Sequence, residues 1–217
     1  MSGRAGPPPG AGVPRPVDGP ASGRDVVLGR IRAALAGSTP PGPAPRDYRR
    51  GGEEADLDLF VERLQDYRAV VHRCPPERVA ATVAGVIAGA VVVPSGLDPA
   101  WLPAEREVIH DDGLPADRIA AAGGVVTGAA VAIAETGTIV LDASPGQGRR
   151  ILSLLPDLHV CVLRPEQVVA AVPDAIGRLD PRRPLTWISG PSATSDIELN
   201  RVEGVHGPRN LHVILLS

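Results

Sequence analysis

Apolar positions along the chain first take a helical spacing and then recur in short runs. The spacing i, i+3, i+4 and i+7 predicts an amphipathic helix whose apolar face holds Leu57, Phe60, Val61 and Leu64. Aliphatic runs typical of strands follow at residues 69–72, 90–93, 107–110, 125–127, 131–134, 138–142, 158–163, 185–189 and 211–216. Because several of these runs are apolar on both faces, they predict a covered, mainly parallel sheet.

Helices are expected between several of these strands, at residues 76–87, 116–122 and 165–179, the last interrupted at Pro173. The runs 131–134 and 138–142 are an exception, because Thr136-Gly137 between them favours a hairpin turn. Strands that alternate with helices predict an α/β fold. We therefore expect a mainly parallel sheet with one local antiparallel hairpin.

The N-terminal region differs in composition from the rest of the chain. Twelve of residues 1–24 are Pro or Gly, and such a segment buries too little apolar surface to offset its chain entropy, so a disordered tail is expected. Residues 25–49 predict a leader helix, with Asp25 as N-cap and Gly37 as its stop, and a Pro-rich linker. We expect residues 50–217 to form the α/β domain. We expect the leader helix to dock on this domain, with docking on a partner as the alternative.

Composition excludes several classes of function. The net charge is −3 and only five residues are aromatic, which argues against a nucleic-acid-binding protein. All 22 basic residues are Arg, so the chain has no lysine for a Schiff base or for a phosphate-binding P-loop. The remaining composition, 43% hydrophobic and 22% charged, is ordinary for a globular protein.

The chain has only two cysteines, Cys74 and Cys161, and this number limits its possible redox chemistry. Iron–sulfur clusters are generally held by four thiolates, so this chain alone cannot hold one. The two residues form no Cys-x-x-Cys motif, and we expect no disulfide framework. The sequence has no signal-peptide core and no apolar stretch of about 20 residues, so we expect a cytoplasmic protein without a membrane span.

The hairpin turn carries the first candidate chemistry. Glu135 precedes Thr136, Gly137 and Thr138 at the end of an apolar strand, where a carboxylate would project from the rim of the sheet. There it can act as a general base, or as a nucleophile towards an acyl group. The alternative is a carboxylate that only accepts hydrogen bonds from the N–H groups of the turn.

A second polar segment follows the run 185–189. Ser189, Gly190, Pro191 and Ser192 leave an apolar strand and can present hydroxyl and N–H groups to a carboxylate or phosphate. A tight turn with a capping serine explains the same pattern. Both interpretations stay open at this stage.

Further along, Asp196, Glu198 and His206 supply two carboxylates and an imidazole, and Gly207 follows the histidine. Asp196 and Glu198 share a face if the segment is extended. A hard metal site and an acid/base pair are two interpretations; a solvated edge with a structural histidine is the favoured one, so we expect no metal site. Gln147, Arg149 and Arg150 offer anion-binding groups in a Gly-rich loop, or else a solvated helix start.

Three of these segments, residues 132–141, 189–198 and 204–208, together resemble the lactate-utilisation protein C (LUD domain) family. The similarity extends over about residues 50–217. It implies a three-layer Rossmann-like fold like that of the CoA-transferase and ribose-phosphate isomerase superfamily. It also implies a role in oxidising L-lactate to pyruvate beside iron–sulfur partner proteins, with clusters in the partners and no cofactor in this chain.

The resemblance transfers no catalytic residues, so the candidate site rests on the motifs themselves. The predicted catalytic residues are Glu135, Asp196 and His206. The predicted ligand-binding residues are Thr136, Gly137, Thr138, Gln147, Arg149, Ser189, Gly190, Ser192, Glu198 and Gly207. We expect a non-redox component of a lactate-utilisation system that binds a small carboxylate or another anion, or supports its partners. The alternatives are an acyl-transfer enzyme with Glu135 as nucleophile and a sugar-phosphate binder or isomerase.

Overall fold

The computed structural model describes residues 22–39, 42–45, 51–194, 202–203 and 207–217, in two units that divide after Asp47. Six strands of the larger unit form a central sheet in the order β1-β12-β7-β4-β2-β3. Every neighbouring pair in it is parallel. The strands are β1 (Val70–Cys74), β2 (Val91–Pro94), β3 (Val108–Asp111), β4 (Gly124–Thr127), β7 (Leu158–Leu163) and β12 (Asn210–Leu216). The predicted α/β class and mainly parallel sheet are confirmed.

The predicted hairpin is confirmed as well, but it belongs to a second sheet. This sheet has the order β8-β5-β6-β9, and its strands are β5 (Val131–Ile133), β6 (Thr138–Leu141), β8 (Val168–Val169) and β9 (Thr186–Ile188). We expected the run 185–189 to complete the central sheet; instead β9 pairs antiparallel with β6. A two-stranded ribbon joins β10 (Ala193–Thr194) to β11 (Val202–Glu203).

Helices connect and cover these strands. They are α2 (Leu57–Asp66), α3 (Val79–Val86), α4 (Ala116–Ala120) and α5 (Val172–Arg178), with short 3₁₀ turns η1 (Pro76–Arg78), η2 (Pro99–Trp101), η3 (Arg150–Ser153) and η4 (Pro165–Gln167). The apolar stripe predicted for α2 faces inward, since Phe60 and Leu64 are fully buried. Asp56 caps this helix by accepting from the N–H groups of Asp58 and Leu59.

The helix predicted over residues 165–179 is wrong. The segment contains η4, then strand β8, and only then α5. The two β-branched residues Val168 and Val169 pair with Ala132 and Ile133 of β5, so a tertiary partner outweighs the local helical pattern. Pro173 lies in the first turn of α5, where its missing N–H costs little, and does not interrupt a helix.

The smaller unit contains helix α1 (Gly23–Leu35). Its N-cap is Ser22 and not the predicted Asp25, because the Ser22 hydroxyl accepts from the Asp25 N–H and donates to the Asp25 carboxylate. Gly37 follows its end with a φ of 85°, as predicted. Residues 1–21 of the expected disordered tail lie outside the described residues. In the part of the chain that the structure describes, no helix is long and apolar enough to cross a membrane.

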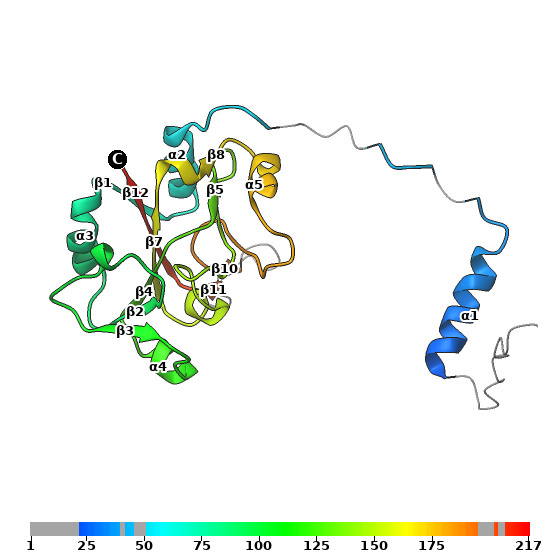
Figure 1. Cartoon of the computed structure of the whole chain (residues 1–217), viewed down its shortest axis with the longest axis horizontal. Coiled ribbons are helices and arrows are strands. Elements are labelled where there is room, and N and C mark those ends of the chain that lie inside the picture. The colour runs from blue at the N-terminus through cyan, green and yellow to red at the C-terminus, as the bar shows by residue number, and fades with distance from the viewer. Residues whose placement is uncertain (1–21, 40–41, 46–50, 195–201, 204–206) are drawn as a thin grey trace, which may run out of the picture. The chain divides into compact units, whose positions relative to one another are not determined.

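The core lies on both faces of the central sheet. On one face, Val79 of α3 packs with Val160 and Ile214. On the other, Phe60 of α2 and Ile139 of the second sheet pack against Leu215. Helix α5 covers the outer face of the second sheet. Figure 1 shows this order, with α3 on one side of β7 and β12 and with β5 and α5 on the other side.

Candidate functional site

A cleft of about 240 Å³ opens between strand β9 and the amino ends of β7 and β12. We call it the rim cleft. Its lining residues are Arg150, Ser153, His159, Thr186, Trp187, Ile188, Ser189, Gly190, Pro191, Ser192, Gly207, Pro208 and Leu211. Four predicted ligand-binding residues, namely Ser189, Gly190, Ser192 and Gly207, are thus brought together here.

Strand pairing joins the two polar motifs at one edge of this cleft. Because Ile139 of β6 lies opposite Ile188 of β9, the preceding and following residues, Thr138 and Ser189, become neighbours. Their hydroxyl oxygens are 2.8 Å apart, and the Thr138 hydroxyl is also 2.8 Å from that of Thr136. The result is a continuous row of three hydroxyl groups running from the hairpin turn to the cleft.

The glycines of both motifs are explained by helix α2. Gly137 and Gly190 have φ values of 58° and 88°, in the left-handed region that favours glycine. A Cβ atom on Gly190 would lie 2.5 Å from the Cβ of Tyr67, and one on Gly137 would lie 2.7 Å from the Cβ of Arg63. These two positions therefore allow α2 and its C-cap residue Tyr67 to approach both motifs closely, and the first role of the two glycines is structural.

Arg150 and His159 line the rim cleft, Arg150 with a charged side chain and His159 with a polar one. Arg150 is exposed and donates from Nη1 to the backbone oxygen and the hydroxyl of Ser153, both at 3.1 Å. His159 is fully buried, and its Nε2 lies 2.8 Å from the Thr127 hydroxyl. Burial, together with the smaller effect of the positive charge of Arg150, lowers the pKa of His159 to about 4. The imidazole is therefore neutral at physiological pH.

His159 is not among the predicted site residues, although the sequence contains a signal for it. A histidine stands here inside a strand that is otherwise apolar, residues 158–163. Side chains in a strand alternate between faces, so His159 shares a face with Cys161 and Leu163, towards the second sheet. A polar residue on a buried strand face needs a hydrogen-bond partner, and Thr127 provides one.

Other candidate residues lie elsewhere. Glu135 is exposed in the β5–β6 turn and is not among the residues that line the rim cleft. Arg149 does not line the rim cleft and forms two hydrogen bonds with the Asp111 carboxylate, which hold the pKa of that carboxyl below its usual value. Gln147 is buried, and its side-chain oxygen accepts from the N–H of Asp142. Asp196, Glu198 and His206 lie outside the described residues.

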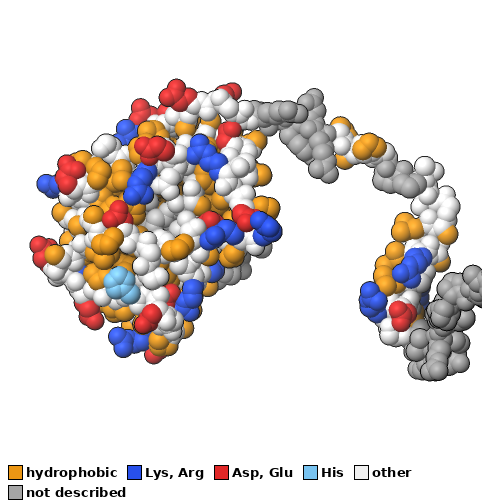
Figure 2. Space-filling model, in the orientation of Figure 1, with side chains coloured by type: hydrophobic (Ala, Val, Ile, Leu, Met, Phe, Trp, Pro, Cys, Tyr) orange, Lys and Arg blue, Asp and Glu red, His pale blue; other side chains and the backbone are white. Residues whose placement is uncertain are grey.

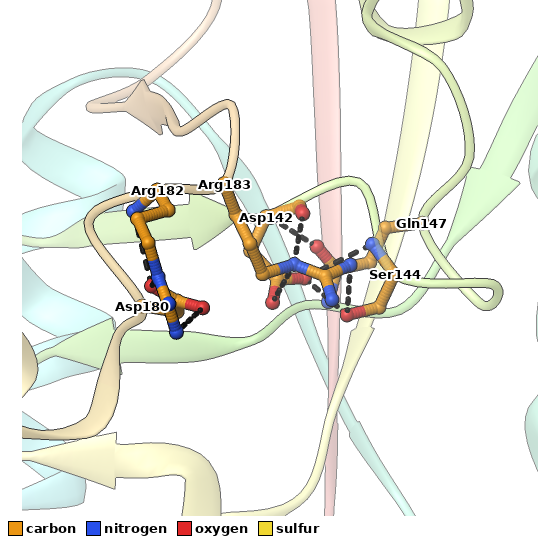
Figure 3. A network of polar contacts seen from close by, with 6 residues as sticks. All are labelled: Asp142, Ser144, Gln147, Asp180, Arg182 and Arg183. Atoms are coloured by element: carbon orange, nitrogen blue, oxygen red, sulfur yellow. Dashed lines mark hydrogen bonds and ion pairs between the residues drawn. The ribbon is translucent and has the colours of Figure 1, made fainter.

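A polar network fixes the loop that carries Arg150 (Figure 3). Arg183 donates to the backbone oxygen of Asp142 at 2.9 Å and pairs with its carboxylate at 3.1 Å. The Ser144 hydroxyl donates to the same carboxylate and accepts from Arg183. Between these residues Ala143 has a φ of 56°, which is unfavourable for a side chain with a Cβ. The network holds this strained turn, and with it the start of η3 at Arg150.

The comparisons with known proteins identify the family. A family model described as the LUD domain matches residues 100–216, a range that includes every residue lining the rim cleft. The chain belongs to the LUD domain family. The resemblance predicted from the three sequence segments is confirmed.

Two curated relatives and one solved structure show how far the similarity extends along the chain. Lactate utilization protein C of Deinococcus radiodurans is 43% identical over 202 residues, which are 88% of this chain and 94% of that protein. Lactate utilization protein C of Bacillus pumilus is 39% identical over 93 residues, 39% of this chain and 38% of the relative. The crystal structure of a DUF162 family protein from Deinococcus radiodurans matches with a TM-score of 0.64 and 39% identity, over 74% of this chain and 96% of that one.

The surface of this LUD protein carries both signs of charge. On the face drawn in Figure 2, arginine and acidic side chains are interspersed, without a broad region of one sign. Together with the net charge of −3, this favours a small ligand over an extended polyanion. Within the described residues, no group of three or more His, Cys, Asp and Glu side chains is placed to hold a metal ion.

Proposed function

We propose that this LUD protein is a non-redox component of an L-lactate utilisation system and that its rim cleft binds a small carboxylate, such as L-lactate or pyruvate. The role in lactate use is supported by the name of the relative that is 43% identical over 88% of the chain. The binding site is supported by one structural observation. Ser189, Gly190 and Ser192 line a single cleft beside the exposed Arg150, and the Thr138 hydroxyl of the hairpin motif lies within hydrogen-bond distance of Ser189 at its edge.

The side chains that line the rim cleft suit a small carboxylate of the size of lactate or pyruvate. A guanidinium fork pairs with both oxygens of a carboxylate, and Arg150 uses only its Nη1 in the hydrogen bonds to Ser153. The Ser189 hydroxyl can donate to an oxygen or accept from the hydroxyl of lactate. Neutral His159 adds a polar group without a competing charge. The volume of about 240 Å³ lies slightly below the usual range for drug-sized ligands, as a small acid requires.

The redox chemistry is assigned to partners. Both cysteines are buried, and burial raises the pKa of Cys161 to about 12, so its thiolate is not available at neutral pH. We propose that this chain carries no cofactor of its own and that iron–sulfur partner proteins accept the electrons of lactate oxidation. This chain then delivers or retains the carboxylate, or stabilises those partners.

The acyl-transfer alternative depends on Glu135. Its backbone N–H donates to the oxygen of Ala170, which fixes the turn, and its side chain is exposed outside the lining of the rim cleft. This position favours the binding role over covalent catalysis. A covalent adduct detected by intact mass after incubation with acyl-CoA, and lost in Glu135→Gln, would reverse that preference.

Deletion of the gene in its native host is expected to abolish growth and oxygen uptake on L-lactate, while growth on glucose continues. Plasmid-borne wild type and Arg118→Gln should restore both, because Arg118 is exposed on α4 outside the rim cleft. Arg150→Gln should fail at normal protein abundance. Glu135→Gln and Asp196→Asn, in the same strain, test the two carboxylates predicted to be catalytic. Unimpaired growth of the deletion strain would refute the role in lactate use; full restoration by Arg150→Gln would refute the assigned site.

A further inference from the structure

A second cleft, of about 390 Å³, opens at the carboxyl ends of β2, β4 and β7. We call it the carboxyl-end cleft, and its side-chain and glycine lining includes Gly96, Asp98, Trp101, Gly128, Arg164 and Gln167. Between β2 and β4 the chain direction across the sheet reverses, because β2 continues to β3 on one side and β4 continues to β7 on the other. In open α/β sheets, ligands bind in the crevice at such a switch point.

Arg164 is oriented for anion binding in this cleft. Its guanidinium carbon lies 5.0 Å from the centre of the Trp101 ring, and stacking of this kind fixes the plane of the fork. Its contact with the Asp98 carboxylate is 3.5 Å long, which is too long for a strong hydrogen bond. The side chain of Arg164 is 49% exposed. A positioned, weakly paired guanidinium therefore faces the cleft.

Asp98 and the glycines add the other parts of a receptor. One Asp98 oxygen accepts from the N–H of Ala100, and the carboxylate retains acceptor capacity for a ligand hydroxyl. The N–H groups of Gly96 and Gly128 donate to the backbone oxygens of Pro145 and Gly146. These two hydrogen bonds hold the 142–150 loop in place along one side of the cleft. A Cβ atom on Gly128 would meet no atom closer than 3.6 Å, so packing does not require glycine there. A methyl group added there would be in ordinary van der Waals contact with the Gly146 backbone oxygen and the Trp101 ring, and it would take up space at the wall of the cleft.

We infer that the carboxyl-end cleft binds a hydroxylated organic phosphate of about the size of a mononucleotide, with its phosphate on Arg164 and its hydroxyl groups on Asp98. A doubly charged phosphate competes with Asp98 for the guanidinium better than a singly charged carboxylate does. The cleft is also the larger of the two, with about 390 Å³ against about 240 Å³. This site is separate from the rim cleft, so its failure and that of the proposed function are distinguishable.

The two tryptophans make the test specific, because Trp101 lines the carboxyl-end cleft and Trp187 lines the rim cleft. In the full-length Trp187→Phe protein, Trp101 is the one remaining tryptophan, so the tryptophan fluorescence reports on the carboxyl-end cleft. Titration with AMP is expected to give a saturable change in its emission. Arg164→Gln in that background should weaken AMP binding by about tenfold or more, because a charge-assisted contact is lost. Gly128→Ala should weaken it by narrowing the cleft, at unchanged stability, while Arg150→Gln should leave it unaltered.

Three results would overturn the inference. The first is the absence of a saturable change at millimolar AMP in a folded Trp187→Phe protein. The second is equal AMP binding by Arg164→Gln, or its loss in Arg150→Gln instead. The third is binding as tight as that of AMP by inorganic phosphate, which would show that the hydroxyl groups are not recognised, or by L-lactate, which would show that the phosphate is not.

Discussion

Phe60→Ala is expected to lower the free energy of unfolding by about 3–5 kcal/mol, the usual cost of truncating a buried phenylalanine. Phe60 is fully buried in the cluster that joins α2 to Ile139 of the second sheet and Leu215 of the central sheet. Its removal leaves a cavity where three elements meet. The effect is functional as well, because α2 and its C-cap residue Tyr67 lie against Gly137 and Gly190, the glycines of the two polar motifs.

Urea unfolding followed by circular dichroism measures this difference. Glu62→Ala is the matched control, since Glu62 lies on the same helix with its side chain 64% exposed, and it should change stability by no more than about 0.5 kcal/mol. Phe60→Leu should cost less than Phe60→Ala, because it keeps most of the buried volume. A loss below about 1 kcal/mol for Phe60→Ala would mean that α2 does not hold the two sheets together.

The free energy of unfolding is also expected to fall by about 3 kcal/mol as the pH is lowered from 6.5 towards 4. His159 is neutral when buried, with its pKa lowered to about 4, whereas in the unfolded chain it titrates near 6.5. Between these two values the unfolded state binds a proton that the folded state does not, so stability decreases with falling pH. The pKa values of His72 and His212 are also lowered by burial, and they add to the loss in the same direction.

His159→Gln separates this contribution from the others. Glutamine keeps a hydrogen-bonding group near Thr127 but does not titrate, so the variant should lose most of the dependence on pH between 6.5 and 4. The measurement is a set of urea unfolding curves at several pH values for both proteins. Parallel stability profiles for the variant and the wild type would show that His159 is not the group responsible.

Much of the fold followed from local signals. The stripe at Phe60 and Leu64 predicted α2, and the run 158–163 predicted β7 at its observed bounds. What the sequence could not supply was pairing between distant segments. Val168 and Val169 take a strand conformation because β5 lies beside them, and β9 joins the second sheet because β6 is its partner. Such contacts leave no local trace in a single sequence.

The candidate site was predictable to a similar degree. Ser189 and Thr138 stood out as polar residues at strand ends, and the β6–β9 pairing brings their hydroxyls together. The two neighbouring arginines could not be told apart from sequence, yet Arg149 pairs with Asp111 while Arg150 lines the rim cleft. Arg149 is the extended residue that precedes η3 and Arg150 is the first residue of that turn, so the backbone conformation changes between them.

The most direct test of the rim cleft is calorimetric titration of the full-length chain with L-lactate and with pyruvate. The wild type and Arg118→Gln are expected to bind at least one of these acids at a single site. Arg150→Gln should weaken that binding by about tenfold or more, the loss expected for one charge-assisted pair. Arg164→Gln, in the other cleft, should bind as the wild type does. Absence of binding by the wild type, or equal binding by Arg150→Gln, would contradict a carboxylate site in the rim cleft.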